Sequence, residues 1–101
     1  MNNALIEVIK RRGIPPLGEQ EDSFDPIIYL EISLFQVSWR WFVTECDIER
    51  EDIMFYGFAS CDFYDWGWFQ LSELEKKDRR VRVYDDFEPL PFSELQKSFE
   101  I

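Results

Sequence analysis

Between residues 27 and 71 the chain alternates apolar and polar side chains with a period of two. In IIYLEISLF (27–35) every second residue is aliphatic, which predicts a half-buried β-strand. Three more stretches predict strands of the same kind: SWRWFVTEC (38–46), IMFYGFASC (53–61) and WGWFQL (66–71). The short segments between them favour antiparallel neighbours in a meander.

An amphipathic helix is predicted at the N-terminus, over residues 3–12. Its apolar side includes Leu5 and Ile9, which lie one turn apart, and Gly13 is suited to end it. Residues 14–26, IPPLGEQEDSFDP, hold three prolines, a glycine and several acids, so neither a helix nor a central strand is expected. We interpret this segment as a linker.

Two segments that share the letters SEL predict the remaining helices. Ser72 and Ser93 are each followed three residues later by Glu or Gln, the spacing of a capping box at a helix N-terminus. The helices should span residues 73–78 and 94–100. Between them, RRVRVYDD (79–86) should form a fifth strand or an extended edge.

These elements predict an α+β fold in one domain of residues 1–101. It would comprise an N-terminal helix (1–13), the linker (14–26) and a sheet with two short helices (27–101). The sheet should be twisted and antiparallel, with four to five strands in a meander. The short helices would lie at the N-terminus, after strand four and at the C-terminus, on one side of the sheet.

The stretch SWRWFVTEC carries large side chains on both of its faces. Strict alternation points Trp39, Trp41 and Glu45 one way, and Phe42 and Cys46 the other way. Helices on one side cover only one face of a sheet. The second face is therefore either wrapped by the N-terminal arm and the FEPLPF segment, or exposed in part as an aromatic platform.

The chain is strongly acidic. With 21 Asp and Glu against 11 Lys and Arg, its net charge of −10 repels nucleic-acid phosphates and anionic membranes. No direct nucleic-acid or membrane partner is expected, whereas a protein with a basic surface is a plausible one; simple solubility is the other explanation of the charge. No signal peptide or membrane-length apolar stretch is recognisable, which predicts a cytoplasmic protein.

Residue types that serve common catalytic and metal sites are scarce. The chain has no histidine and no CxxC pair, so zinc templates and histidine-based catalysis are disfavoured and no cofactor is expected. Asp85, Asp86 and Glu88 form an acidic cluster for a hard cation, but without the spacing of a calcium loop. Cys46 and Cys61 are predicted to be two buried free thiols rather than a pair across strands.

The chain contains, in this order, a Pro-Pro-Leu motif, a Trp-x-Trp-aromatic strand that ends in Thr-Glu, a Phe-x-Gly motif, a Gly-aromatic-Phe-x-Leu-Ser-Glu-Leu motif and a Phe-x-Pro motif. In the order of these motifs it resembles domain of unknown function 2958, a small uncharacterised family of plasmids, phages and integrated elements. The resemblance covers roughly residues 14–96, and departs from the family at KKDRRVRVYDD, before the Phe-x-Pro motif. The matching residues are Pro15, Pro16, Leu17, Asp25, Pro26, Trp39, Trp41, Phe42, Thr44, Glu45, Phe55, Gly57, Gly67, Trp68, Phe69, Leu71, Ser72, Glu73, Leu74, Phe87, Glu88 and Pro89. It implies a mobile-element setting, where small acidic proteins often inhibit host defence systems, some by imitating the charge of DNA.

We therefore expect a non-enzymatic protein-binding module of a mobile element, a monomer or homodimer, that engages a basic surface of a host protein. An inhibitor of a nucleic-acid-handling defence system, of the anti-CRISPR or anti-restriction type, fits this expectation. The predicted contact residues are Trp39, Trp41, Trp66, Trp68, Asp47, Glu49, Glu51, Asp62 and Asp65. The alternative is a small enzyme or small-molecule-binding domain with Glu45 and Tyr56 in an aromatic pocket.

Overall fold

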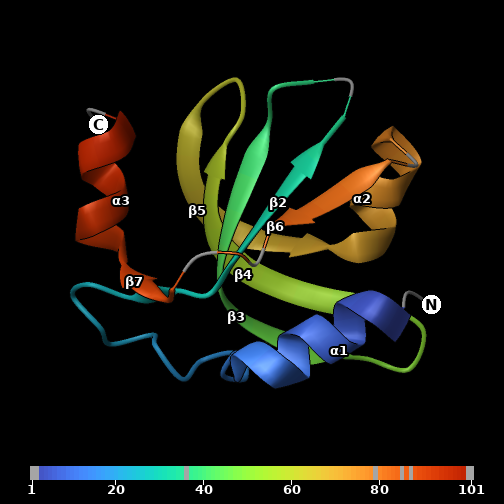
Figure 1. Ribbon diagram of the computed structural model, residues 1–101, viewed down its shortest axis with the longest axis horizontal. Helices are drawn as coiled ribbons and strands as arrows, with labels where there is room; N and C mark the ends of the chain where they lie inside the picture. Colours follow the sequence, from blue (N-terminus) through green and yellow to red (C-terminus); the bar gives the residue numbers. More distant parts are fainter. Residues whose placement is uncertain (1–2, 36, 79, 85, 87, 100–101) are drawn as a thin grey trace.

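A five-stranded antiparallel sheet forms the centre of the molecule (Figure 1). The computed structural model describes residues 3–35, 37–78, 80–84, 86 and 88–99. In spatial order, the strands are β5 (Tyr64–Gln70), β4 (Ile53–Ser60), β3 (Arg40–Ile48), β2 (Leu30–Leu34) and β6 (Val81–Tyr84). Strands β2 to β5 follow one another as a meander, and β6 returns to pair with β2.

Three short helices and a two-stranded ribbon complete the fold. The helices are α1 (Asn3–Arg12), α2 (Leu71–Lys77) and α3 (Phe92–Phe99), and the ribbon pairs β1 (Ile27–Ile28) with β7 (Leu90–Pro91). The predicted α+β class, with helices at the N-terminus, after the fourth strand of the meander and at the C-terminus, is confirmed. Within the described residues, no helix has the length and apolar composition needed to cross a membrane.

The larger core lies between one face of the sheet and the helices α1 and α2. Leu5 and Ile9 of α1 and Leu74 of α2 are buried against aliphatic and aromatic side chains of β2 to β5. Phe55 and Phe69 stack at its centre, with ring centroids 5.2 Å apart. This packing follows from the period-two pattern of the strands and the apolar stripe of α1, because both bury one face.

A smaller core occupies the opposite face of the sheet. There Phe42 and Phe58 are buried together with Ile28, and Leu90 and Phe92 pack over them. The helix α3 therefore belongs to this second face, and the prediction that all helices lie on one side is wrong. The reason is that both faces of β3 and β4 carry apolar bulk, and the segment from Leu90 onward covers part of the second one.

The two C-terminal helices begin earlier than predicted. Helix α2 starts at Leu71 and α3 at Phe92, so Ser72 and Ser93 lie inside the first turn instead of capping it. Each serine amide and hydroxyl donates to an aspartate from a distant segment, Asp52 for Ser72 and Asp25 for Ser93. A carboxylate in this position satisfies a free amide of the first turn and complements the positive end of the helix.

Candidate functional site

A β-bulge in β3 decides which side chains reach the second face of the sheet. Val43 pairs with Gly57, and the next pair is Glu45 with Tyr56, so Thr44 is an extra residue without a partner in β4. A bulge of this kind shifts the side-chain alternation by one position. Beyond Thr44, Glu45 therefore points to the same face as Tyr56.

The bulge overturns the predicted faces of this strand. Cys46 is buried with Trp41 in the larger core, whereas Glu45 lies on the opposite face. The expectation that Glu45 shares a face with Trp39 and Trp41 is therefore wrong. Strict alternation fails because the strand contains one more residue than its neighbour does over the same length.

Glu45 is a buried carboxylate that holds the predicted linker against the sheet. Glu45 is only 4% exposed. Its two carboxylate oxygens accept hydrogen bonds from the backbone amides of Gly18, at 2.9 Å, and Gln20. Gly18 adopts a φ of +92°, a conformation that favours glycine. Two charge-assisted hydrogen bonds from backbone amides compensate for the burial of the charge.

Further contacts keep residues 14–26 in place. The amide of Cys46 donates to the carbonyl of Pro15 at 3.0 Å, beyond Val43, which pairs with the first residue of β2. The side-chain amide of Gln20 donates to the carbonyls of Ile27 and Thr44, and its oxygen accepts the amide of Ile27. The segment predicted as a linker is thus a fixed wall beside the second face.

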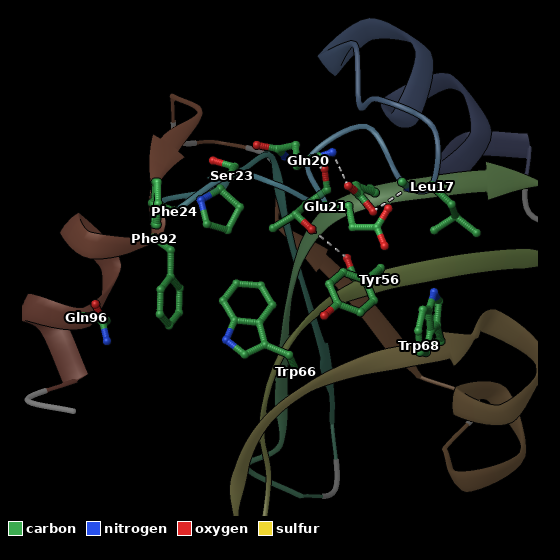
Figure 2. Close-up of a pocket in the computed structure, with 14 residues that line it drawn as sticks. Leu17, Gln20, Glu21, Ser23, Phe24, Tyr56, Trp66, Trp68, Phe92 and Gln96 are labelled. Carbon is green, nitrogen blue, oxygen red and sulfur yellow. Dashed lines mark hydrogen bonds between the residues drawn. The ribbon is translucent and has the colours of Figure 1, made fainter.

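Between this wall, the sheet and α3 lies a groove of about 760 Å³ (Figure 2). Tyr56 of β4 lies between two indoles of β5, with ring centroids 6.1 Å from Trp66 and 5.1 Å from Trp68. Phe92 of α3 continues the row, 4.7 Å from Trp66. The lining residues are Leu17, Gly18, Gln20, Glu21, Ser23, Phe24, Pro26, Thr44, Glu45, Tyr56, Trp66, Trp68, Phe92 and Gln96.

The aromatic lining of the groove is open to solvent at two places. Trp68 is 70% exposed and Phe24, on the linker side, is fully exposed. These two rings line the groove but are not buried in either core, so they form an exposed apolar surface. Exposed aromatic surface of this kind is typical of contact sites.

The groove is also acidic. Glu21 and Glu45 line it, and its lining residues include neither Lys nor Arg. The pKa of Tyr56 is raised, first by burial and then by the negative charges of Glu45, Asp65 and Glu21. Burial alone would raise this pKa, and the three carboxylates add to the effect because their negative charges disfavour the phenolate.

The four tryptophans do not form one platform. Trp41 is only 7% exposed and belongs to the larger core, where Trp39 packs against it with ring centroids 6.2 Å apart. Trp66 and Trp68 line the groove on the opposite face. The predicted aromatic platform is thus reduced to two indoles, because Trp41 of β3 and Trp39, just before that strand, pack into the larger core.

The five acids predicted for partner contact also lie apart. Asp47, Glu49 and Glu51 belong to the β3–β4 hairpin, and Asp62 and Asp65 to the start of β5 and the turn before it, at the other end of the sheet (Figure 1). Asp47 accepts the amide of Leu17 at 3.2 Å and so helps to hold the wall of the groove. Among the five, Asp65 is the one whose charge acts on Tyr56.

Several residues of the groove come from segments that were predicted to be loops connecting the helices and strands. Glu21 and Phe24 lie in the predicted linker, and Phe92 in the lead into the last helix. The one signal for them is a phenylalanine inside the acidic stretch QEDSFDP, where no core strand or helix is predicted to bury it. Tyr56 and Glu45, predicted for the alternative pocket, both line the groove.

Among the described residues, neither the cysteines nor the acids form a metal centre. Cys46 and Cys61 are both free, but Cys61 is only partly buried, so the prediction of two buried thiols is wrong for Cys61. Burial and the nearby Asp47 raise the pKa of Cys46 to about 12. In the part of the chain that the structure describes, no cluster of three or more Cys, Asp or Glu could hold a metal ion. Asp85, of the predicted cation cluster, falls outside these residues.

Comparisons with known proteins found no relative for this arrangement: no protein-family model, no curated protein and no solved structure matches the chain.

Proposed function

We propose that the chain is a non-enzymatic protein-binding module whose groove receives a basic segment of a partner protein. The observation that carries this proposal is the composition of the groove, which five aromatic side chains and two glutamates line without a lysine or arginine among them. A guanidinium or ammonium group over an aromatic ring is stabilised by about 0.5–2 kcal/mol, depending on its desolvation. Nearby carboxylates add hydrogen bonds and charge.

The charge of the whole chain supports the same partner. A net charge of −10 accelerates encounter with a basic surface, and this effect weakens as the salt concentration rises. The exposed ring of Trp68 would anchor the complex once it has formed. Kinetic measurements can separate the contribution of the acidic residues from that of Trp68. Acidic residues act mainly on the association rate, and a buried aromatic contact acts mainly on the dissociation rate.

The motif resemblance suggests which protein carries the basic segment. In a mobile element, the partner would be a host protein with a basic surface, such as a nucleic-acid-handling defence complex that the chain inhibits. This part of the proposal rests on association with a family setting and on the charge of the chain. The groove supports only the chemistry proposed for the segment, namely that it is basic.

Binding of a defined basic peptide tests the proposal. The probe is a capped seven-residue peptide that alternates arginine and threonine, with a glutamate–threonine peptide as the control ligand. Trp68→Ala should weaken binding about tenfold at unchanged net charge, because it removes one exposed cation–π contact. Phe63→Ala, which removes an exposed ring outside the groove, should leave affinity unchanged.

Two results would contradict the proposal. The first is equal binding of the acidic and basic peptides by the unmodified chain. The second is an equal loss of peptide affinity in Trp68→Ala and Phe63→Ala. Because Phe63 lies outside the groove, that result would mean that the peptide binds elsewhere. Repeating the titration at high salt should reduce affinity for the basic peptide while preserving the difference between the two variants.

A small organic cation is a second candidate ligand, favoured by the size of the groove. About 760 Å³ falls within the range of small-molecule sites, roughly 300–1,000 Å³. A quaternary ammonium compound is a suitable probe, because aromatic rings recognise such groups. If it binds with millimolar affinity or better and displaces the peptide, the groove is a ligand pocket with Glu45 and Tyr56 in its wall.

A further inference from the structure

We infer that the basic segment binds as an added strand along β5, with its backbone paired to that edge and alternate side chains over the groove. This inference rests on the proposed function, and it specifies how the partner is held. Strand addition of this kind takes affinity from main-chain hydrogen bonds and specificity from the side chains at every second position.

β5 is an edge strand with little protection against pairing. It pairs with β4 over all seven of its residues without a register shift, and it contains no proline, lysine or arginine. Proteins usually shorten, bend or charge such an edge. The opposite edge, β6, is only four residues long and carries Arg82, so the two edges of this sheet differ.

The hydrogen bonds of β5 show which backbone groups face outward. The amide of Trp66 donates to the carboxylate of Asp65 at 2.8 Å, and the amide of Gln70 donates to Glu73 at 3.2 Å. Backbone groups in an antiparallel ladder point alternately toward and away from the neighbouring strand. Trp68 lies two residues from Trp66 and two from Gln70, so by this alternation its amide and carbonyl also point away from β4.

These outward groups belong to the residues whose side chains line the groove. Trp66 and Trp68 present both their rings to the groove and their backbone to the free edge. Phe92 of α3 packs on the ring of Trp66, whereas Trp68 is 70% exposed, so Trp68 is the centre of the accessible edge. A strand added there would lay every second side chain beside the aromatic row.

The charges along the edge select a basic segment over a second copy of this chain. Asp65 and Glu73 flank Trp68 and accept the amides on either side of it. A copy of the chain brings a net charge of −10 to the same edge and is repelled. Arginines at alternate positions would instead lie over the rings of Trp66 and Trp68, beside the glutamates of the groove, which commits the inference to a basic, extended segment.

Amide hydrogen exchange of the chain with the arginine–threonine peptide tests this binding mode. Upon binding, the outward amide of Trp68 should slow in exchange by at least tenfold, whereas that of Trp66, which already donates to Asp65, should slow less. Asp65, Gly67 and Phe69, whose amides point toward β4, should change little. The period of two distinguishes strand pairing from a general loss of solvent access.

A second peptide with N-methyl groups on alternate residues provides the matched control. It keeps the charge and the side chains but cannot donate along one edge, so one of its two methylation registers should lose at least tenfold in affinity. If the basic peptide binds, and Trp68→Ala weakens it, but Trp68 shows no exchange protection, the strand mode is wrong and the proposed function stands. If no basic peptide binds, both fail.

Discussion

At the scale of single residues, one bulge accounts for the position of the groove. Thr44 is the additional residue in β3, and it turns Glu45 from the larger core to the second face. There the carboxylate receives the amides of Gly18 and Gln20 and fixes the wall of the groove. Without the bulge, a buried charge would face the apolar core, which costs several kcal/mol unless it is paired.

The bulge also explains why position 57 is glycine. A Cβ added to Gly57 would lie 2.0 Å from the carbonyl oxygen of Phe42, which is backbone and cannot move aside. We expect Gly57→Ala to lower the free energy of unfolding by about 3 kcal/mol, as overpacking does in a closed site. Urea denaturation of the purified variant measures this change.

Gly67 is the matched control for that substitution. It lies opposite Gly57 on β5, and a Cβ there would meet nothing within 4 Å. Gly67→Ala should therefore stay within about 1 kcal/mol of the parent protein or be slightly more stable, since alanine restricts the unfolded chain. Equal destabilisation by both substitutions would contradict the account of the bulge.

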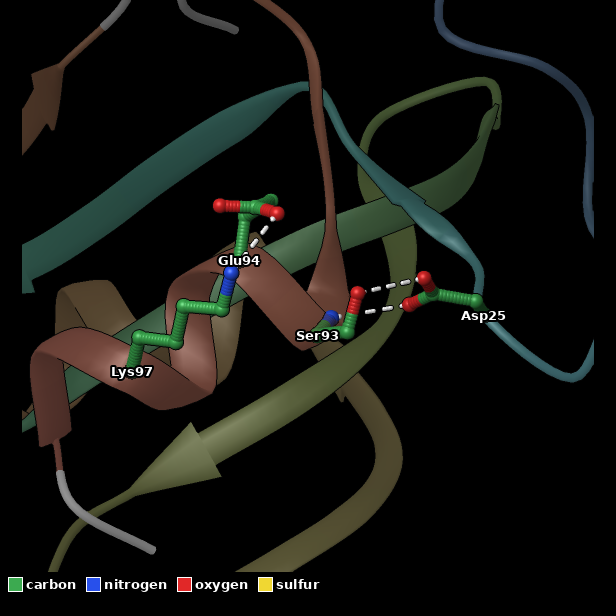
Figure 3. A network of polar contacts seen from close by, with 4 residues as sticks. All are labelled: Asp25, Ser93, Glu94 and Lys97. Carbon is green, nitrogen blue, oxygen red and sulfur yellow. Dashed lines mark hydrogen bonds and ion pairs between the residues drawn. The ribbon is translucent and has the colours of Figure 1, made fainter.

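At the scale of elements, two helices use the same device at their N-termini. In α3, the amide and hydroxyl of Ser93 both donate to Asp25, at 2.8 and 2.6 Å (Figure 3). In α2, Ser72 and Asp52 repeat this arrangement at 3.1 and 2.6 Å. Each aspartate lies far from its serine in the sequence, so the contact also ties the helix to the linker or to a hairpin.

The Asp25 contact predicts a dependence of stability on acid. The hydroxyl of Ser93, and then its amide, lower the pKa of Asp25 from its ordinary value of 3.8. A depressed pKa in the folded state means that the contact stabilises the fold above pH 3.8 and that this stabilisation is lost as the pH falls through the folded-state pKa.

We expect the stability of Asp25→Asn to fall less than that of the parent protein as the pH is lowered from 6 to 2. The midpoint of urea denaturation at each pH measures this stability. At pH 6 the variant should be less stable than the parent, and the two should converge toward pH 2. Asp22→Asn changes the same charge at an exposed position on the same segment and is the control. If both variants give the same pH profile, the Ser93 contact is not responsible.

The patterns along the sequence predicted most elements but not the site. The helix of residues 3–12 and the four central strands follow from local periodicity, and they form nearly where expected. The bulge has no marker in the sequence, because Thr44 alternates like its neighbours. The helix starts were missed because a distant aspartate, rather than the serine, satisfies the first turn.

The linker is the clearest case of structure that local patterns do not contain. Its three prolines and its glycine correctly exclude a helix or a central strand, yet its position is set by Glu45 and by the side chain of Gln20. Both contacts join residues at least 24 positions apart. Predicting them requires the register of β3, which in turn depends on the bulge.

At the scale of the whole molecule, the sheet has chemically different edges. Near β6, the guanidinium carbons of Arg80 and Arg82 lie 4.0 and 4.4 Å from the ring centre of Phe35, forming a basic aromatic group. At the other edge, β5 borders the acidic groove. A basic partner is therefore attracted to one edge and repelled from the other, which gives the proposed complex a defined orientation.

The four tryptophans provide a built-in test of this account, since two line the groove and two pack on the opposite face. The measurement is the set of indole ¹⁵N–¹H signals of the unmodified chain during titration with the arginine–threonine peptide. The account predicts that the signals of Trp66 and Trp68 move in proportion to binding while those of Trp39 and Trp41 stay in place. Movement of Trp39 and Trp41 with Trp66 and Trp68 unchanged would contradict it.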